Sequence, residues 1–214
     1  MQTTSIRLIT VSREFGAGGS ELAGDLASRL GWPVLDHDIV HRVAERLRLD
    51  DGTVEAFDEH TPSLLARIAT VLIVPQPYMY SVPVEDAPSH DAIAEATRRV
   101  ITEAAASLPV IVVGHGAQCI FADRSDAMHI RVVAPLNARL QRIATRMNLD
   151  PSAAAALVRR ADEDRQSYVQ RYFHRDWRNP LLYDLQVNTG RVGVADAGAM
   201  VAEFVGRSVG HEHV

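Results

Sequence analysis

The sequence contains no lysine, and all 22 residues of the lysine and arginine class are arginines. An arginine side chain carries a planar guanidinium group that can bind two oxygen atoms at once, whereas a lysine presents a single point charge. Any basic side chain that binds a phosphate in this protein therefore has to be a guanidinium.

Cysteine is almost absent as well, since Cys119 is the only one. One cysteine excludes an intramolecular disulfide and a zinc site built on thiolates, and it is typical of a small buried hydrophobic side chain. Apolar runs are short: none approaches the roughly 20 residues of a membrane-spanning helix. The segment 1–5 lacks the pattern of a secretory signal. We therefore expect a cytoplasmic protein without a membrane partner.

The remaining composition is that of an ordinary globular protein, with 47% hydrophobic and 23% charged residues among 214. This length suffices for one domain with a sizeable core and an inserted lobe. The net charge of −5 and the isoelectric point near 6.0 argue against a nucleic-acid partner. Arginines are nevertheless concentrated in 139–178 and interleaved with acidic residues. Such a run either binds polyphosphate or forms a solvated, salt-bridged helix face.

The most informative segment is 9–23, where an apolar run leads into a glycine turn that opens a helix. Glycines at 16, 18 and 19 allow the backbone to adopt positive φ and to approach an anion closely. The unpaired N–H groups at the start of the following helix point at that anion, and the helix dipole favours its negative charge. The segment therefore predicts a phosphate-binding loop.

This loop departs from the common motif G-x-x-x-x-G-K-[ST] at two positions. When the motif is aligned on Gly18 and Ser20, Arg13 occupies the first glycine position and Gly19 occupies the lysine position. The hydroxyl group that binds Mg²⁺ in the motif is retained as Ser20. We hypothesise that Arg13 binds phosphate; the alternative is a surface ion pair with Glu14 or Glu21.

Strands alternate with helices along the chain, which predicts an α/β fold with a parallel sheet and right-handed crossovers. Residues 50–108 are interrupted by prolines and are interpreted as an inserted helical lobe. The expected strands are 6–12, 32–36, 109–114, 129–134 and 184–188. The expected helices are 20–30, 37–49, 62–73, 89–107, 136–147, 151–172 and 194–207.

These features resemble the cytidylate kinase-like family of the P-loop nucleoside monophosphate kinases, in which the loop lysine is commonly absent. The resemblance covers nearly the whole chain. Six segments carry it: the loop 12–20, the segments 35–42 and 113–117, the arginine-bearing segment 160–165, the aromatic segment 172–177 and the segment 182–190. It implies a three-layer P-loop fold with a five-stranded parallel sheet, a core of 1–49 and 109–208, an acceptor-binding lobe at 50–108 and a helical lid at 151–178.

The resemblance also implies the ligands and the residues that hold them. ATP with Mg²⁺ would lie on the loop, where the binding residues are Gly16, Ala17, Gly18, Gly19, Ser20 and Glu21, with Ser20 also binding the metal. The acceptor positions are Asp36, Arg42 and His115, of which His115 replaces the arginine of a Gly-Arg motif. A neutral imidazole offers one donor where arginine offers five, which weakens a role for this position in phosphate binding.

Catalytic roles fall to Arg13 and to two lid arginines, Arg160 and Arg165, which would stabilise charge on the transferring group. From spacing alone, Arg160 with Asp164 and Arg165 with Asp162 are equally well explained as surface pairs along a helix. Asp36 is equally well explained as the N-cap of the helix that follows it. The histidines complete no metal site with a third ligand.

The expected function is therefore ATP-dependent phosphoryl transfer to a small acceptor, most simply a nucleoside monophosphate such as CMP. The alternative is a regulatory nucleotide-binding protein with a degenerate P-loop, since two charged contacts are altered. A dinucleotide-binding oxidoreductase is excluded because G-x-G-x-x-G is incomplete: position 21 is a glutamate. The number of subunits, a homodimer included, stays open.

Overall fold

The structure is a computed structural model that describes residues 5–36, 90–107 and 109–209. Five parallel strands form one sheet in the order β2-β3-β1-β4-β5. They are β1 (Leu8–Arg13), β2 (Val34–Leu35), β3 (Val110–Val113), β4 (Ala127–Val133) and β5 (Leu185–Asn188). The predicted five-stranded parallel sheet is thus confirmed, although β2 is shorter than the expected strand.

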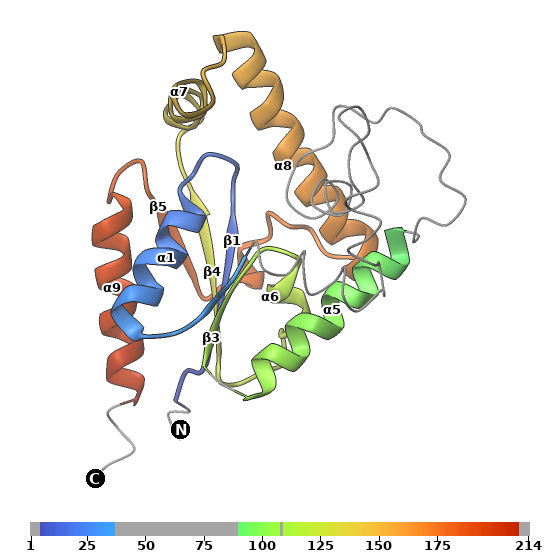
Figure 1. Cartoon of the computed structure of the whole chain (residues 1–214), viewed down its shortest axis with the longest axis vertical. Helices are drawn as coiled ribbons and strands as arrows, with labels where there is room; N and C mark the ends of the chain where they lie inside the picture. Colours follow the sequence, from blue (N-terminus) through green and yellow to red (C-terminus); the bar gives the residue numbers. More distant parts are fainter. Residues whose placement is uncertain (1–4, 37–89, 108, 210–214) are drawn as a thin grey trace, which may run out of the picture.

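Helices cover both faces of the sheet and make a three-layer arrangement (Figure 1). One face is packed by α1 (Gly19–Leu30) and α9 (Val194–Val209), and the other by α5 (His90–Ser107) and the short α6 (Ala117–Ile120). Parallel strands covered on both faces are buried along their length, which agrees with the wholly apolar sequence of β3. β1 is buried as well, including its polar Thr10 and Ser12.

The strand β1 divides its side chains between the two layers. Ile9 and Val11 pack against α1 and α9, while Leu8 packs toward α5 and α6. Thr10 is buried and hydrogen-bonded to the His129 ring, with Thr10 Oγ1 2.8 Å from Nδ1. This alternation holds β1 centrally in the sheet and fixes the position of the loop that follows it.

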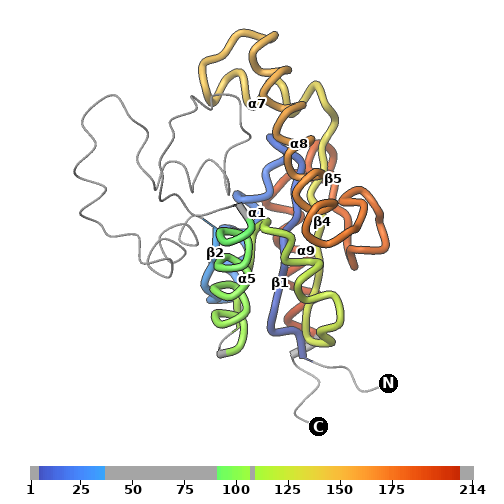
Figure 2. Tube along the Cα trace, turned by 90° about the vertical axis from the view of Figure 1, so that its right-hand side faces the viewer, coloured from blue at the N-terminus to red at the C-terminus, as the bar shows by residue number. Residues whose placement is uncertain are grey.

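A helical hairpin lies past the carboxyl ends of the strands (Figure 1, Figure 2). It consists of α7 (Leu136–Met147) and α8 (Pro151–Phe173). Asn148 ends α7 with a left-handed φ of 50°, and the carboxylate of Asp150 accepts hydrogen bonds from the first amides of α8. These caps allow the chain to reverse within a few residues. The hairpin therefore lies over the loop that joins β1 to α1.

The helices expected at 20–30, 89–107, 136–147, 151–172 and 194–207 are present as α1, α5, α7, α8 and α9. The sequence patterns did not predict α6 or the 3₁₀ turn η1 (Pro180–Leu182). The helices expected at 37–49 and 62–73 lie outside the described residues. Although α5 falls within 50–108, its buried side chains pack on the sheet. No helix in the described part of the chain is both long enough and apolar enough to span a membrane.

The core on the α1 face is expected to dominate the stability of this fold. Leu26 is fully buried between α1 and the sheet, whereas Leu181 is 90% exposed. Leu26→Ala should lower the free energy of unfolding by about 2–5 kcal/mol because it removes buried methyl groups and leaves a cavity. The matched control Leu181→Ala should change it little. Urea unfolding measures both, and equal effects would contradict this packing.

Candidate functional site

Every backbone carbonyl from residue 13 to residue 18 accepts a hydrogen bond from the protein. Three are bound by arginines of the hairpin: Arg13 O by Arg165 Nη1 at 3.0 Å, Phe15 O by Arg139 Nη1 at 3.2 Å, and Gly16 O by Arg142 Nη1 at 2.5 Å. The others are bound by Ala17 N, Thr189 Oγ1 and Leu22 N. The loop carbonyls are therefore held against the scaffold.

Four amides of the same loop differ from its carbonyls. Among the described residues, none accepts a hydrogen bond from the N–H groups of Gly16, Gly18, Gly19 and Ser20. Gly16 and Gly18 have φ angles of 79° and 85°, the left-handed region that glycine enters at little cost. Amides at the N-terminus of a helix are suited to binding an anion, so the start of α1 is the candidate anion site.

The carboxylate of Asp162 connects the loop to α8. It accepts a hydrogen bond from Phe15 N at 2.8 Å and pairs with Arg139 at 2.6 Å, and Arg165 lies 3.8 Å away. Asp162 is only 9% exposed, so its pair with Arg165 is not the surface pair that the spacing offered as the alternative. The Phe15 ring packs among the apolar residues of the hairpin, with Arg165 stacked over it. The hairpin therefore contacts the loop through both hydrogen bonds and apolar packing.

The side chain of Arg13 lies between two glycines. Its aliphatic part fills the space beside Gly19, and its guanidinium lies against Gly114. Arg13 Nη2 is 3.6 Å from Asp36 Oδ1, with both side chains largely buried. The surface pair with Glu14 or Glu21 is not formed, because Glu14 faces Arg139 and Glu21 faces Arg146. Burial lowers the pKa of Arg13, and the Asp36 charge opposes this shift.

His115 lies in the turn between β3 and α6, next to Arg13 and Asp36. Its φ is 55°, between Gly114 at 80° and Gly116 at 67°. A left-handed histidine is uncommon, and such strain persists only where the surroundings impose it. Burial, and then the charge of Arg13, lower the pKa of His115 to about 3. The imidazole is therefore neutral at physiological pH, and Arg13 is the positively charged member of the group Arg13, Asp36 and His115.

The two predicted lid arginines lie in different surroundings on α8. Arg165 is directed at the loop, and burial followed by the charge of Arg13 lowers its pKa to about 9. Arg160 is half-exposed and pairs with Asp164 at 3.7 Å, as its spacing suggested. The structure thus brings Arg165 to the loop and leaves Arg160 on the outer side of the helix.

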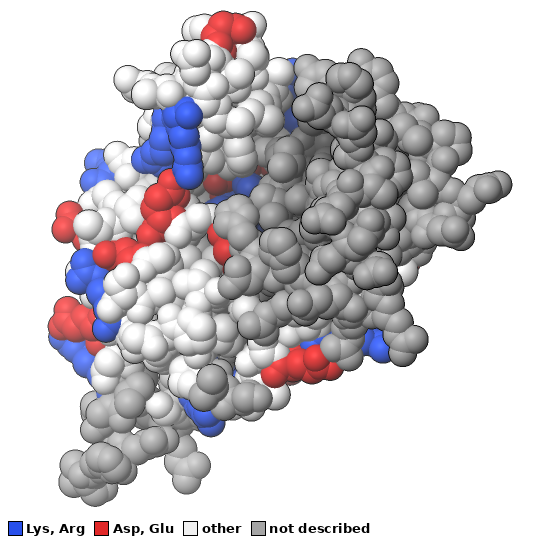
Figure 3. Space-filling model, viewed as in Figure 1, with Lys and Arg blue, Asp and Glu red and all other residues white. Residues whose placement is uncertain are grey.

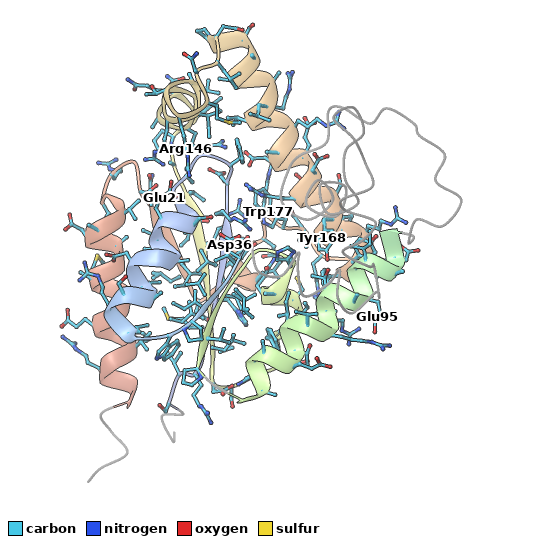
Figure 4. All side chains as sticks on the ribbon, in the orientation of Figure 1. Glu21, Asp36, Glu95, Arg146, Tyr168 and Trp177 are labelled. Carbon is cyan, nitrogen blue, oxygen red and sulfur yellow. The ribbon has the colours of Figure 1, made fainter. Side chains whose placement is uncertain are left out.

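The remaining predicted residues lie around the start of α1. Ala17 and Gly19 are buried, and Ser20 is exposed on the first turn. Glu21 points toward Arg146 below α7, with 2.7 Å between Oε1 and Nη1 (Figure 4). Acidic and basic side chains alternate over this side of the molecule (Figure 3). Arg42 lies outside the described residues. Within the described ranges, no three His, Cys, Asp or Glu side chains gather as a metal site.

Several residues that shape the loop were not among the predicted site residues. They are Arg139, Arg142, Thr189 and Asp162, the last considered only as a helix-surface partner of Arg165. The concentration of arginines in 139–178 was the available signal. A solvated helix face does not explain this concentration, since three of these arginines, Arg139, Arg142 and Arg165, bind carbonyls of the loop.

A cytidylate kinase from Desulfurococcus amylolyticus is 29% identical over 106 residues, which are 49% of this chain and 56% of that protein. The match thus spans only about half the length of this relative.

Solved structures are similar in fold. A protein of uncharacterised function from Eubacterium ventriosum superposes with a TM-score of 0.67 at 19% identity, over 93% of this chain and 98% of that chain. A shikimate kinase from Bacteroides thetaiotaomicron gives 0.54 at 13% identity, with the same two coverages of 93% and 98%. Together with the glycine loop after β1, these similarities identify the fold as that of the P-loop kinases.

The cytidylate kinase-like family matches residues 8–191, a range that begins with β1 and ends just after β5. A match of this extent takes in the loop, the whole sheet and the helical hairpin, and the chain therefore belongs to the cytidylate kinase-like family.

Proposed function

We propose that this protein transfers the γ-phosphoryl group of ATP, with Mg²⁺, to a small acceptor, a nucleoside monophosphate such as CMP. The observation that carries the proposal is the loop itself, whose carbonyls are all bound by the scaffold while its amides converge at the start of α1. This geometry suits a polyphosphate. Membership of the cytidylate kinase-like family supports the choice of acceptor.

In this proposal the chain supplies position and charge. The acceptor oxygen attacks the γ-phosphorus in line while the bond to the ADP oxygen breaks, so the protein has little covalent work to do. The loop amides hold the phosphates, and Arg13 and Arg165 reduce the charge on the transferring group. Asp36 and the neutral His115 lie next to Arg13 and would face the acceptor.

The exposed hydroxyl of Ser20 fits the requirements of Mg²⁺. Magnesium usually keeps several water ligands and takes few protein oxygens besides those of the substrate phosphates, so it needs no cluster of carboxylates. When bound, the ion would neutralise charge on the phosphate oxygens. On the first turn of α1, Ser20 stands beside the amides that would hold those phosphates.

Ser20→Ala should therefore lower kcat/KM for ATP by about a hundredfold, a loss typical of removing one group that stabilises a transition state. Ser28→Ala is the matched control, because Ser28 lies in the same helix and its hydroxyl donates to Gly24 O, one turn earlier in that helix. Transfer from labelled ATP to a panel of monophosphates measures both variants. No product with any monophosphate would remove the acceptor assignment, and tight ATP binding without transfer would favour the regulatory alternative.

Substitution of the two lid arginines tests their proposed roles separately. Arg165→Gln should lower kcat by about a thousandfold, because an arginine that stabilises the transition state contributes on this order. Arg160→Gln should lower kcat less, since Arg160 has to leave Asp164 before it reaches a nucleotide. Steady-state kinetics with ATP Kd values separate catalysis from binding. A smaller effect at Arg165 than at Arg160 would contradict this assignment.

A further inference from the structure

Positions 13 and 19 compete for one volume. A Cβ atom on residue 19 would lie 2.4 Å from the Cβ of Arg13 and 2.7 Å from its Cγ. Cβ atoms in proteins essentially never approach other heavy atoms within 3.0 Å. Because a Cβ is fixed by its own backbone, no change of rotamer at Arg13 relieves this contact. In this backbone only one of the two positions can carry a side chain.

The usual motif also has a side chain at only one of these two positions, but at the other one. In G-x-x-x-x-G-K-[ST], the residue aligned with position 13 is glycine and the residue aligned with position 19 is lysine. Here position 13 is arginine and position 19 is glycine. We propose that the two departures are a single exchange, in which the phosphate-binding cation enters from the end of β1 and not from the start of α1. This inference rests on the proposed function and deepens it.

The surroundings of Arg13 suit such a role. Its guanidinium lies against Gly114, where a Cβ would be 2.0 Å from Nη1. Among the described side chains, its recorded partner is Asp36 at 3.6 Å, beyond hydrogen-bond distance. Arg139 and Arg142, by contrast, already donate to loop carbonyls. Arg13 therefore keeps its donors for an anion beside the loop amides.

The exchange predicts that the double variant Arg13→Gly with Gly19→Lys recovers the ATP affinity that each single substitution lowers. Arg13→Gly removes the cation, and ATP affinity should fall about ten- to a hundredfold, as expected for one charge-assisted hydrogen-bonding group. Gly19→Lys alone inserts a Cβ against that of Arg13 and should weaken binding at least as much. The double variant should bind ATP within about threefold of wild type, a coupling typical of residues in contact.

Arg13→Ala with Gly19→Lys is the matched control. It carries the same lysine but keeps a Cβ at position 13, so the contact at 2.4 Å remains. This control should not recover ATP affinity. Calorimetry with ATP and Mg²⁺ measures ATP affinity, which tests whether the two positions supply the same phosphate-binding cation. Melting temperatures without nucleotide test whether side chains at the two positions occupy the same space. In the second measurement Gly19→Lys should lower the melting temperature in the wild-type background and much less in the Arg13→Gly background.

Additive losses, an unfolded double variant, or equal recovery by the alanine control would each overturn the exchange. These outcomes are separate from failure of the proposed function. A wild-type protein that binds ATP but transfers no phosphoryl group would refute the kinase proposal, while the binding cycle would still test the exchange. If the wild type bound no ATP, the shared cation role would fail, and the melting temperatures would still decide whether the two positions share one volume.

Discussion

The candidate site depends on the orientation of the peptide groups in the loop after β1. Its carbonyls face the hairpin, β5 and the first turn of α1, where Arg139, Arg142 and Thr189 bind three of them. Buried carbonyls need such partners. The carboxylate of Asp162 supports the same loop conformation, because it accepts a hydrogen bond from the Phe15 amide and balances the charge of Arg139. The contacts that hold the carbonyls thus also fix the loop whose amides are the proposed anion site.

Positive charge around this loop is carried by guanidinium groups, and their contacts differ. Arg139 and Arg142 bind backbone carbonyls, Arg165 bridges the loop and α8, and Arg13 lies beside Asp36 without a hydrogen bond from its guanidinium to any described residue. Guanidinium groups remain protonated in proteins and suit such partly buried positions, where an ammonium would lose its charge more readily. The neutral His115 adds no second positive charge next to Arg13. In the proposed function, the cation that the loop itself contributes is therefore Arg13, at the end of β1, beside Arg165 from α8.

Much of the fold was predictable because its signals are local. The apolar run of β1, the glycines after it and the helical spacing of α7 and α8 predict elements within a few residues of those observed. The role of Asp162 was not predictable, because the spacing of Asp162 and Arg165 is the same on a solvated helix as on one packed against a loop. Burial decides between them, and burial depends on tertiary contacts. The steric relation of positions 13 and 19 likewise exists only once the loop has folded.

The packing of the Phe15 ring among the apolar residues of the hairpin ties the hairpin to the loop. Swinging α7 and α8 away from the sheet would expose that ring, break the bonds of Asp162 and release the carbonyls held by Arg139. Separating the hairpin from the loop would therefore cost all of these contacts together. By linkage, an anion that prefers the ordered loop would also favour the docked hairpin. Because α8 is one continuous helix, the same docking also fixes its far end, where Arg171 and Tyr172 contact Asp91 of α5.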